Sequence, residues 1–229
     1  MTKLKKVNVS QAAKKLDQPF MVMRVAHVSD IVASVYICQG MLQWHRHLDN
    51  DEMFWVCEGS ILLESDWGSV RLRPGELSVV PKGIGHRSTA DMRASVLLLR
   101  CGSIPERKNG HRRLYTTAGD QSLERISLRD VARTLPVPLK FQTATRIEDS
   151  VVQVARGEGT WQVEIPASHD VMFFVLDGTA TLRTAQSMLH LHPGELAVVP
   201  LGAVYQLHTS KGTTLARVTR EDAPPETDD

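Results

Sequence analysis

The chain has 229 residues, of which 42% are hydrophobic, enough for one large domain or two small ones with a sizeable core. Its 27 lysine and arginine residues nearly balance 26 aspartate and glutamate residues, so charge gives no reason to expect a nucleic acid or an anionic membrane as partner. The N-terminus leads into no apolar run, no stretch is long enough to span a bilayer, and the three cysteines form no CxxC pair. We therefore expect a cytoplasmic chain with free thiols.

A short helix is expected first, over residues 8–16, because Asn8 can cap it, Gln11 holds the capping-box position and Pro19 lies beyond its end. After it the sequence breaks into short β-type segments separated by Gly- and Pro-rich turns, which predicts an all-β sandwich or barrel. The expected strands are Met21–Val28, Ile31–Cys38, Met41–His47, Met53–Val56, Ile61–Glu64, Ser69–Leu72, Leu77–Val80 and Ala94–Leu99.

A polar, Gly-containing stretch over residues 103–121 is the best candidate for a linker. A second short helix is expected from Ser127 to Leu135, stopped by Pro136, and the β-type pattern resumes beyond it. The tail over residues 222–229 is acidic and Pro-rich, so we expect it to be disordered.

The second half of the chain repeats the first. Gly59 and Gly178 lie 119 positions apart, and at the same offset Pro74-Gly-Glu-Leu77 matches Pro193-Gly-Glu-Leu196. An ungapped match of this quality indicates a tandem duplication of one β unit of domain size. We expect one barrel over residues 1–110 and a second over residues 111–221.

Four side chains in the first half form a candidate metal site. His45 and His47 are two apart, so on a strand both imidazoles would point to one face, and Glu52 follows across a polar turn. His86 lies beyond a second turn. Three imidazoles and one carboxylate suit a divalent first-row metal and leave coordination positions open.

These residues resemble the two cupin motifs. Gly40, His45-x-His47, Glu52 and Gly59 are similar to the first motif, and Gly75, Pro81-x-Gly83 and His86 to the second, although Ala90 replaces the usual polar residue after the histidine. The resemblance covers both halves of the chain. It implies two tandem double-stranded β-helix jelly rolls with the metal inside the barrel. The two capping patterns place a short helix before each barrel.

The second half departs from the motifs at every ligand. His45, His47, Glu52 and His86 correspond to Glu164, Pro166, Val171 and Tyr205, while the turn residues remain. We therefore expect one divalent transition metal (iron, manganese, nickel, zinc or copper) in the N-terminal barrel, and a C-terminal barrel that is structural or holds a different ligand. A second site built from His169, His190 and His192 is the less favoured alternative. Further cavity-lining candidates are Gln43, Tyr36, Phe54 and Ser88.

Three functions stay open at this stage. The first is a metal-dependent enzyme of dioxygenase (oxidoreductase), isomerase or lyase type that acts on a small oxygen-donor molecule. The second is a non-catalytic protein that binds or senses a small ligand, and the third is a structural protein whose barrels associate. The expected partners are a small molecule and a second copy in a homodimer, with no nucleic acid and no membrane. Trp44 and Trp55 have the opposite parity to the ligands, so we expect them outside the barrel, where Trp is typical of a subunit contact.

Overall fold

The computed structural model describes residues 4–101, 121–163 and 167–221, so most of the expected linker and all of the expected tail lie outside the described residues. The described chain is almost entirely β-structure, in two eight-stranded sheets with one short helix before each barrel. This confirms the all-β class. None of the described helices combines the length and the apolar character that crossing a bilayer requires.

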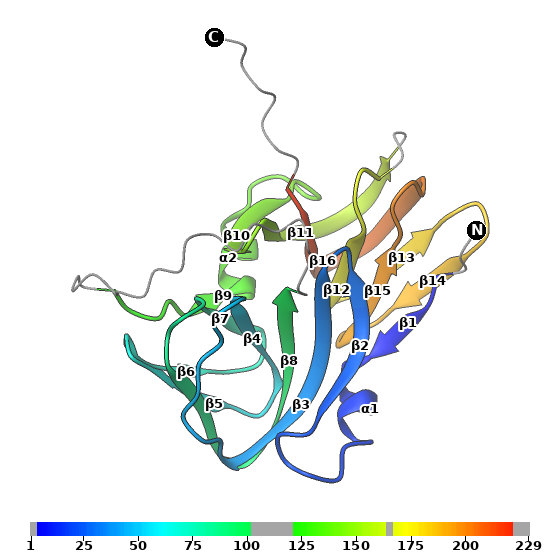
Figure 1. Cartoon of the computed structure of the whole chain (residues 1–229). Helices are drawn as coiled ribbons and strands as arrows, with labels where there is room; N and C mark the ends of the chain where they lie inside the picture. The colour runs from blue at the N-terminus through cyan, green and yellow to red at the C-terminus, as the bar shows by residue number, and fades with distance from the viewer. Residues whose placement is uncertain (1–3, 102–120, 164–166, 222–229) are drawn as a thin grey trace.

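The first sheet has the order β2-β3-β8-β4-β7-β9, with β5 paired to β8 and β6 to β5 (Figure 1). Its strands are β2 (Val22–Val28), β3 (Ile31–Met41), β4 (Glu52–Glu58), β5 (Ile61–Ser65), β6 (Gly68–Leu72), β7 (Glu76–Val80), β8 (His86–Cys101) and β9 (Ile126–Ser127).

The second sheet has the order β1-β15-β12-β16-β11-β10, with β13 paired to β16 and β14 to β13. Its strands are β1 (Lys6–Asn8), β10 (Gln142–Ile147), β11 (Ser150–Val163), β12 (Val171–Asp177), β13 (Ala180–Arg183), β14 (Met188–Leu191), β15 (Glu195–Val199) and β16 (Tyr205–Arg220). We call the body formed by the first sheet the N-terminal barrel and the body formed by the second the C-terminal barrel.

The two helices form where their caps predict. In α1 (Val9–Ala13) the Asn8 side chain accepts a hydrogen bond from the Gln11 backbone N–H, and in α2 (Leu128–Thr134) Ser127 accepts one from Asp130. Both helices are shorter than expected, and helices of this length depend on tertiary packing for their stability. Val9 and Leu128 are fully buried in the apolar layer between the barrels.

One predicted strand is wrong. Met41–His47 does not form a strand: β3 ends at Met41, and residues 42–51 run as a loop in which only His45 keeps a β-bridge, to His86. Pairing with β8 continues past the register shift at Gly40 as far as Met41, which lies opposite Thr89. Between this pair and the His45–His86 bridge the chain has one residue more than β8, and this extra residue interrupts the ladder. The predicted strand Ala94–Leu99, by contrast, lies within a longer strand of 16 residues, β8.

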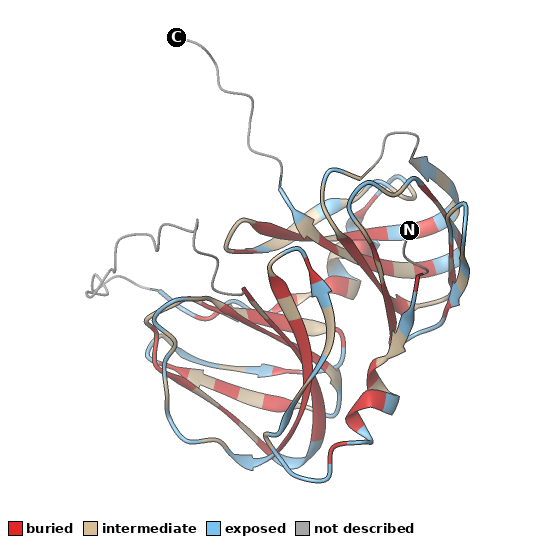
Figure 2. Cartoon of the chain, turned by 45° about the vertical axis from the view of Figure 1, so that its right-hand side comes forward, coloured by how far each residue is buried: buried red, intermediate tan, exposed pale blue. Residues whose placement is uncertain are grey.

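Apolar side chains fill three separate regions, and buried stripes follow the strands through both barrels and between them (Figure 2). Alternate residues of each long strand point to opposite faces, so one face fills a barrel and the other packs against the neighbouring barrel. On β8, Leu98 belongs to the interior of the N-terminal barrel, whereas Leu97 and Leu99 belong to the layer between the barrels.

The barrels exchange their short terminal strands. β1, at the start of the chain, pairs with β15 of the C-terminal barrel, and β9, which follows residues 102–120, pairs with β7 of the N-terminal barrel. The two pairings are equivalent, since Val7 lies opposite Leu196 and Ile126 lies opposite Leu77, each residue 119 positions from its counterpart. The duplication visible in the sequence is therefore a pseudo-twofold relation in space.

A pair of equivalent aspartates reinforces this relation at the barrel junction. The Asp51 carboxylate accepts backbone N–H groups from Lys82 of its own barrel at 2.9 Å and from Glu148 of the other at 3.4 Å. Its counterpart Asp170 accepts those of Leu201 and Ser29, both at 2.8 Å. Each aspartate thus joins a loop of its own barrel to a hairpin of the other.

Trp55 lies at the centre of the apolar layer. It is fully buried, and its ring centroid is 4.8 Å from that of Phe174, its own counterpart in the C-terminal barrel. Trp55 was expected outside its barrel at a subunit contact. It does lie outside the barrel interior, but it packs against the other half of the same chain. Trp44, also expected outside, is 46% exposed.

The substitution Trp55→Ala tests the contribution of this layer. We expect it to lower the free energy of unfolding by about 3–5 kcal/mol, because it removes a large buried ring and leaves a cavity between the barrels. Trp44→Ala is the matched control and should cost less than about 1 kcal/mol because that ring is half exposed. Urea unfolding followed by circular dichroism measures both, and equal losses in the two variants would contradict the central role of the layer.

Candidate metal centre

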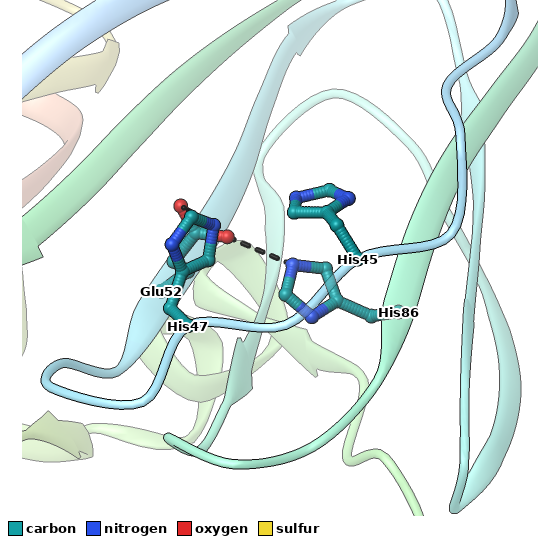
Figure 3. A group of neighbouring side chains, drawn as sticks. All are labelled: His45, His47, Glu52 and His86. Atoms are coloured by element: carbon teal, nitrogen blue, oxygen red, sulfur yellow. Dashed lines mark hydrogen bonds and ion pairs between the residues drawn. The ribbon is translucent and has the colours of Figure 1, made fainter.

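The four predicted ligands come from three places in the N-terminal barrel and converge on one point (Figure 3). Glu52 begins β4, His86 begins β8, and His45 and His47 lie in the loop between β3 and β4. A pair of backbone hydrogen bonds fixes this loop against β8: His45 N–H donates to the His86 carbonyl at 3.1 Å, and His86 N–H donates to the His45 carbonyl at 2.8 Å. A β-bridge between two ligands therefore replaces the expected strand.

The side chains lie at distances that suit a shared ion. One donor atom from each of the four lies within 4.8 Å of the others. The Glu52 carboxylate spans the group, with Oε2 2.8 Å from His86 Nε2 and Oε1 3.2 Å from His47 Nε2. The His45 and His86 rings are 4.5 Å apart between centroids. Three imidazole nitrogens and a carboxylate form a donor set that fits a divalent first-row metal.

Backbone carbonyls orient two of the imidazoles. His45 Nδ1 lies 2.9 Å from the Gln43 carbonyl oxygen, and His86 Nδ1 lies 3.0 Å from that of Ile84. A carbonyl can only accept, so the Nδ1 atom of each ring carries the hydrogen, and the Nε2 lone pair is left for a metal. This arrangement is the usual outer support of a histidine ligand.

The electrostatics of the site keep its donors in the forms that bind a metal. Burial raises the pKa of Glu52, but its close contacts with His47 and His86 outweigh it and lower this pKa to about 2. Burial is also the main cause that lowers the pKa of His45. At neutral pH Glu52 is therefore a carboxylate and His45 a neutral imidazole, the states that coordinate a metal.

Arg100 is a site residue that sequence reasoning missed. It extends from β8, where it pairs in register with Glu52, and its Nη1 lies 3.3 Å from Glu52 Oε1. Strand alternation could have indicated it, because Arg100 is two residues beyond Leu98 and therefore points to the same face of the strand. The expected strand stopped at Leu99, one residue too early to include it.

A cavity of about 120 Å³ opens beside the ligands. Tyr36 and Phe54, both proposed from the sequence, line it, while Ser88 lies behind Tyr36 and accepts a hydrogen bond from its hydroxyl at 3.2 Å. Gln43 is exposed and is not part of this wall; it contributes its backbone carbonyl to His45. The remaining walls are apolar apart from the ligands and Arg100, and they consist of Phe20, Val22, Leu42 and Leu98.

The corresponding positions of the C-terminal barrel carry no such group among the described residues. Val171 and Tyr205, which replace Glu52 and His86, are packed in the apolar interior, and Glu164 and Pro166 lie outside the described residues. A second group of potential ligands in the described chain, Asp30, Cys101 and Asp149, lies at the barrel junction, where Asp149 also pairs with Arg220 at 2.9 Å.

Comparison with known proteins identifies the fold. A family model described as cupin matches residues 142–229. The uncharacterized protein YdbB of Bacillus subtilis is 28% identical over 87 residues, which are 38% of this chain and 77% of that protein. Among solved structures, a cupin 2 conserved barrel domain protein from Leptotrichia buccalis superposes with a TM-score of 0.71 at 11% identity, over 96% of this chain and 98% of that one.

A salicylate 1,2-dioxygenase from Pseudaminobacter salicylatoxidans superposes with a TM-score of 0.70 at 14% identity, over 95% of this chain and 84% of that one. The protein YlbA from E. coli reaches a TM-score of 0.62 at 10% identity, over 98% of this chain and 93% of that one. At these identities the likeness shows the fold alone. Together with the family match over residues 142–229, it shows that the chain has the cupin fold.

Metal content tests the candidate ligands directly. We expect the purified protein to retain close to one equivalent of a divalent transition metal, and His45→Ala/His86→Ala to lose at least about nine-tenths of it, because two of four donors are removed. The double variant His27→Ala/His190→Ala removes two histidines outside the cluster and should keep the metal. Elemental analysis measures the content, with circular dichroism to confirm folding, and an unchanged content in the first variant would refute the site.

Metal affinity should decrease as the pH is lowered. Protons compete with the metal for the imidazoles, so affinity should be nearly constant from about pH 7 to 8 and fall steeply below about pH 6. Glu52, whose pKa is lowered to about 2, should not contribute to the loss in this range. Competition with a chromogenic chelator at a series of pH values measures the effect, and an affinity that stays constant down to pH 4 would contradict histidine ligation.

Proposed function

We propose that this protein is a metal-dependent enzyme of the dioxygenase type that acts on a small carboxylate-bearing molecule in the N-terminal barrel. The observation that carries the proposal is the juxtaposition of Arg100 with the four-residue cluster at one cavity. An isomerase or a lyase on the same scaffold is the runner-up, because the donor set is compatible with either reaction.

The size and lining of the cavity support a small substrate. Ligand pockets commonly measure about 300–1,000 Å³. This cavity measures about 120 Å³ and has Phe54 and Leu98 in its walls, which favours a compact, partly apolar molecule. Arg100 supplies the one permanent positive charge of the lining, and its planar guanidinium matches a carboxylate. The structurally similar salicylate 1,2-dioxygenase, which was also solved as adducts with gentisate, suggests hydroxylated aromatic acids as the first class to test.

Each protein group has a distinct role in this proposal. A bound metal would supply a Lewis acid with open coordination positions beside the substrate. His45, His47, Glu52 and His86 would hold it. Arg100 would orient the substrate carboxylate, while its contact with Glu52 keeps both charges compensated.

Tyr36 is suited to donate a hydrogen bond rather than to act as a base. Burial is the main cause that raises its pKa above the ordinary value, so the hydroxyl remains protonated at neutral pH. Phe54 lies edge-on to His86, with ring centroids 5.6 Å apart, and shields this side of the site from water.

Oxygen uptake with a defined panel tests the activity. The protein is loaded anaerobically with Fe²⁺ or Mn²⁺ in turn and mixed with salicylate, gentisate and their uncharged amides. We expect uptake with at least one acid, and an increase in its KM of at least about tenfold in Arg100→Gln, with little change for the amide, because the variant removes a charge-assisted hydrogen bond.

Arg71→Gln, which removes an exposed charge from β6, is the matched control and should leave KM unchanged. Absence of turnover on the whole panel with either metal would refute the dioxygenase. Retained binding of the same acids without turnover would favour the role of a small-ligand sensor.

The remaining sequence-based expectations belong to the same proposal. We propose a bicupin organisation with domains over residues 1–110 and 111–221, a homodimer and a cytoplasmic location. The two eight-stranded sheets support the first of these. Light scattering coupled to size-exclusion chromatography tests the second.

A further inference from the structure

The C-terminal barrel contains a cation where the N-terminal barrel has an apolar wall. On β16, Arg217 lies in register with Gln153 of β11 and Phe173 of β12. Leu98 has the same place in the N-terminal barrel, since it lies in register with Ser34 of β3 and Phe54 of β4, and it lines the cavity beside the metal ligands. The position that faces the metal cavity in one barrel thus carries a guanidinium in the other.

Aromatic rings and one amide hold this guanidinium. Its central carbon lies 4.2 Å from the Phe141 ring centroid and 5.2 Å from that of Trp161. Nε donates a hydrogen bond to Gln153 Oε1 at 2.6 Å, and the Gln153 amide in turn donates to Thr143 Oγ1 at 3.2 Å. Over the described part of the chain, neither terminal nitrogen of Arg217 makes a hydrogen bond or an ion pair with the protein.

A cation in these surroundings lowers the stability of the folded protein. A partly buried guanidinium loses hydration, and aromatic faces compensate only in part. Burial accordingly lowers the pKa of Arg217. Leu98 shows that an apolar residue satisfies the same position in the same fold. A residue that costs stability in this way is typical of a functional site.

The replaced ligand position adds to the aromatic surroundings. Tyr205, the counterpart of His86, is buried with its ring centroid 6.1 Å from that of Trp161 and 5.7 Å from that of Phe173. Among these rings only Tyr205 replaces an imidazole, because Trp161 and Phe173 correspond to Leu42 and Phe54.

A cavity of about 360 Å³ adjoins this cluster, because Phe141 and Gln153 belong to both. Thr143 and Lys140 also line it, as does the apolar segment of residues 135–137. Its volume is in the range typical of small-molecule sites, and Lys140 gives its wall a positive charge. Arg217 is not in the lining itself but contacts Phe141 and Gln153, which are.

We propose that the C-terminal barrel is a second binding site, one that takes a small organic carboxylate through the terminal nitrogens of Arg217. A guanidinium presents two parallel N–H donors that match the two oxygens of a carboxylate. The aromatic and apolar walls suit an organic group attached to that carboxylate. A single interior guanidinium suits one negative charge better than the two that phosphate carries near neutral pH. The site needs no metal and is independent of the function proposed for the other barrel.

Calorimetric titration with benzoate tests the proposal on the full chain, treated with a chelator to remove metal. Because Arg100 could also attract an anion, the Arg100→Gln variant serves as the background. We expect benzoate binding to persist in this background and to weaken at least about tenfold when Arg217→Leu is added, which installs the residue of the other barrel. Benzamide, uncharged and of the same shape, should bind at least about tenfold more weakly than benzoate. Arg71→Gln in place of Arg217→Leu is the control and should leave affinity unchanged.

The stability of the variants separates binding from a structural role. We expect Arg217→Leu to unfold at the same urea concentration as the parent protein or a higher one, and saturating benzoate to raise the midpoint of the parent only. Equal affinities for benzoate and benzamide, unchanged benzoate binding in Arg217→Leu, or absence of binding to the parent would each overturn the proposal. So would a destabilised Arg217→Leu together with a destabilised Arg217→Lys, which retains the charge. Tighter binding of inorganic phosphate than of benzoate would also overturn it.

Discussion

The apolar layer between the two barrels is the contact on which the rest of the structure depends. Each barrel sheet has one face turned into its own interior and another that would be exposed in isolation. Trp55 and Phe174 meet at the centre of this layer, and both helices pack into it. Burial of this apolar surface explains why the chain folds as two joined barrels rather than as two independent ones. The exchanged strands join the barrels further. β1 precedes the N-terminal barrel but pairs with β15 of the C-terminal barrel, and β9 precedes the C-terminal barrel but pairs with β7 of the N-terminal barrel.

This junction lies close to the candidate metal site along the chain. Asp51, which accepts hydrogen bonds from both barrels, directly precedes Glu52, the carboxylate that spans the imidazoles. The loop that carries His45 and His47 is therefore fixed at two points, by the bridge to His86 at one end and by Asp51 at the other. Ligands on an irregular loop need such support, because a loop alone orders side chains poorly.

The duplicated halves have separated in chemistry while keeping one backbone. The N-terminal barrel surrounds its small cavity with imidazoles, one carboxylate and Arg100, whereas the C-terminal barrel has Arg217 between aromatic rings. The fold tolerates either arrangement, because the backbone hydrogen bonds that hold the strands together do not depend on which side chains fill the barrel interior. Function in this chain therefore lies in the particular side chains and not in the barrel.

Much of the fold was readable from the sequence. Alternating apolar residues, the turns around Pro74 and Pro193, and the caps Asn8 and Ser127 act locally, so they predict strands, helices and a repeated unit without knowledge of distant contacts. The four candidate ligands were also readable, because their spacing survives in the sequence as a motif. The structure places them together, although His45 and His47 approach from a loop and not from a strand.

Long-range geometry decided the rest. The exchange of β1 and β9, the meeting of Trp55 with its own counterpart, and the contacts of Arg100 and Arg217 all join residues far apart in the chain. No local pattern distinguishes Arg217 from a solvated arginine, since its rings come from Phe141 and Trp161 on other segments. The sequence by itself determined the all-β class, the repeat and the candidate ligands, because those depend on periodicity and spacing. Only the tertiary structure decided which charges face the interiors, because the register between strands sets that choice.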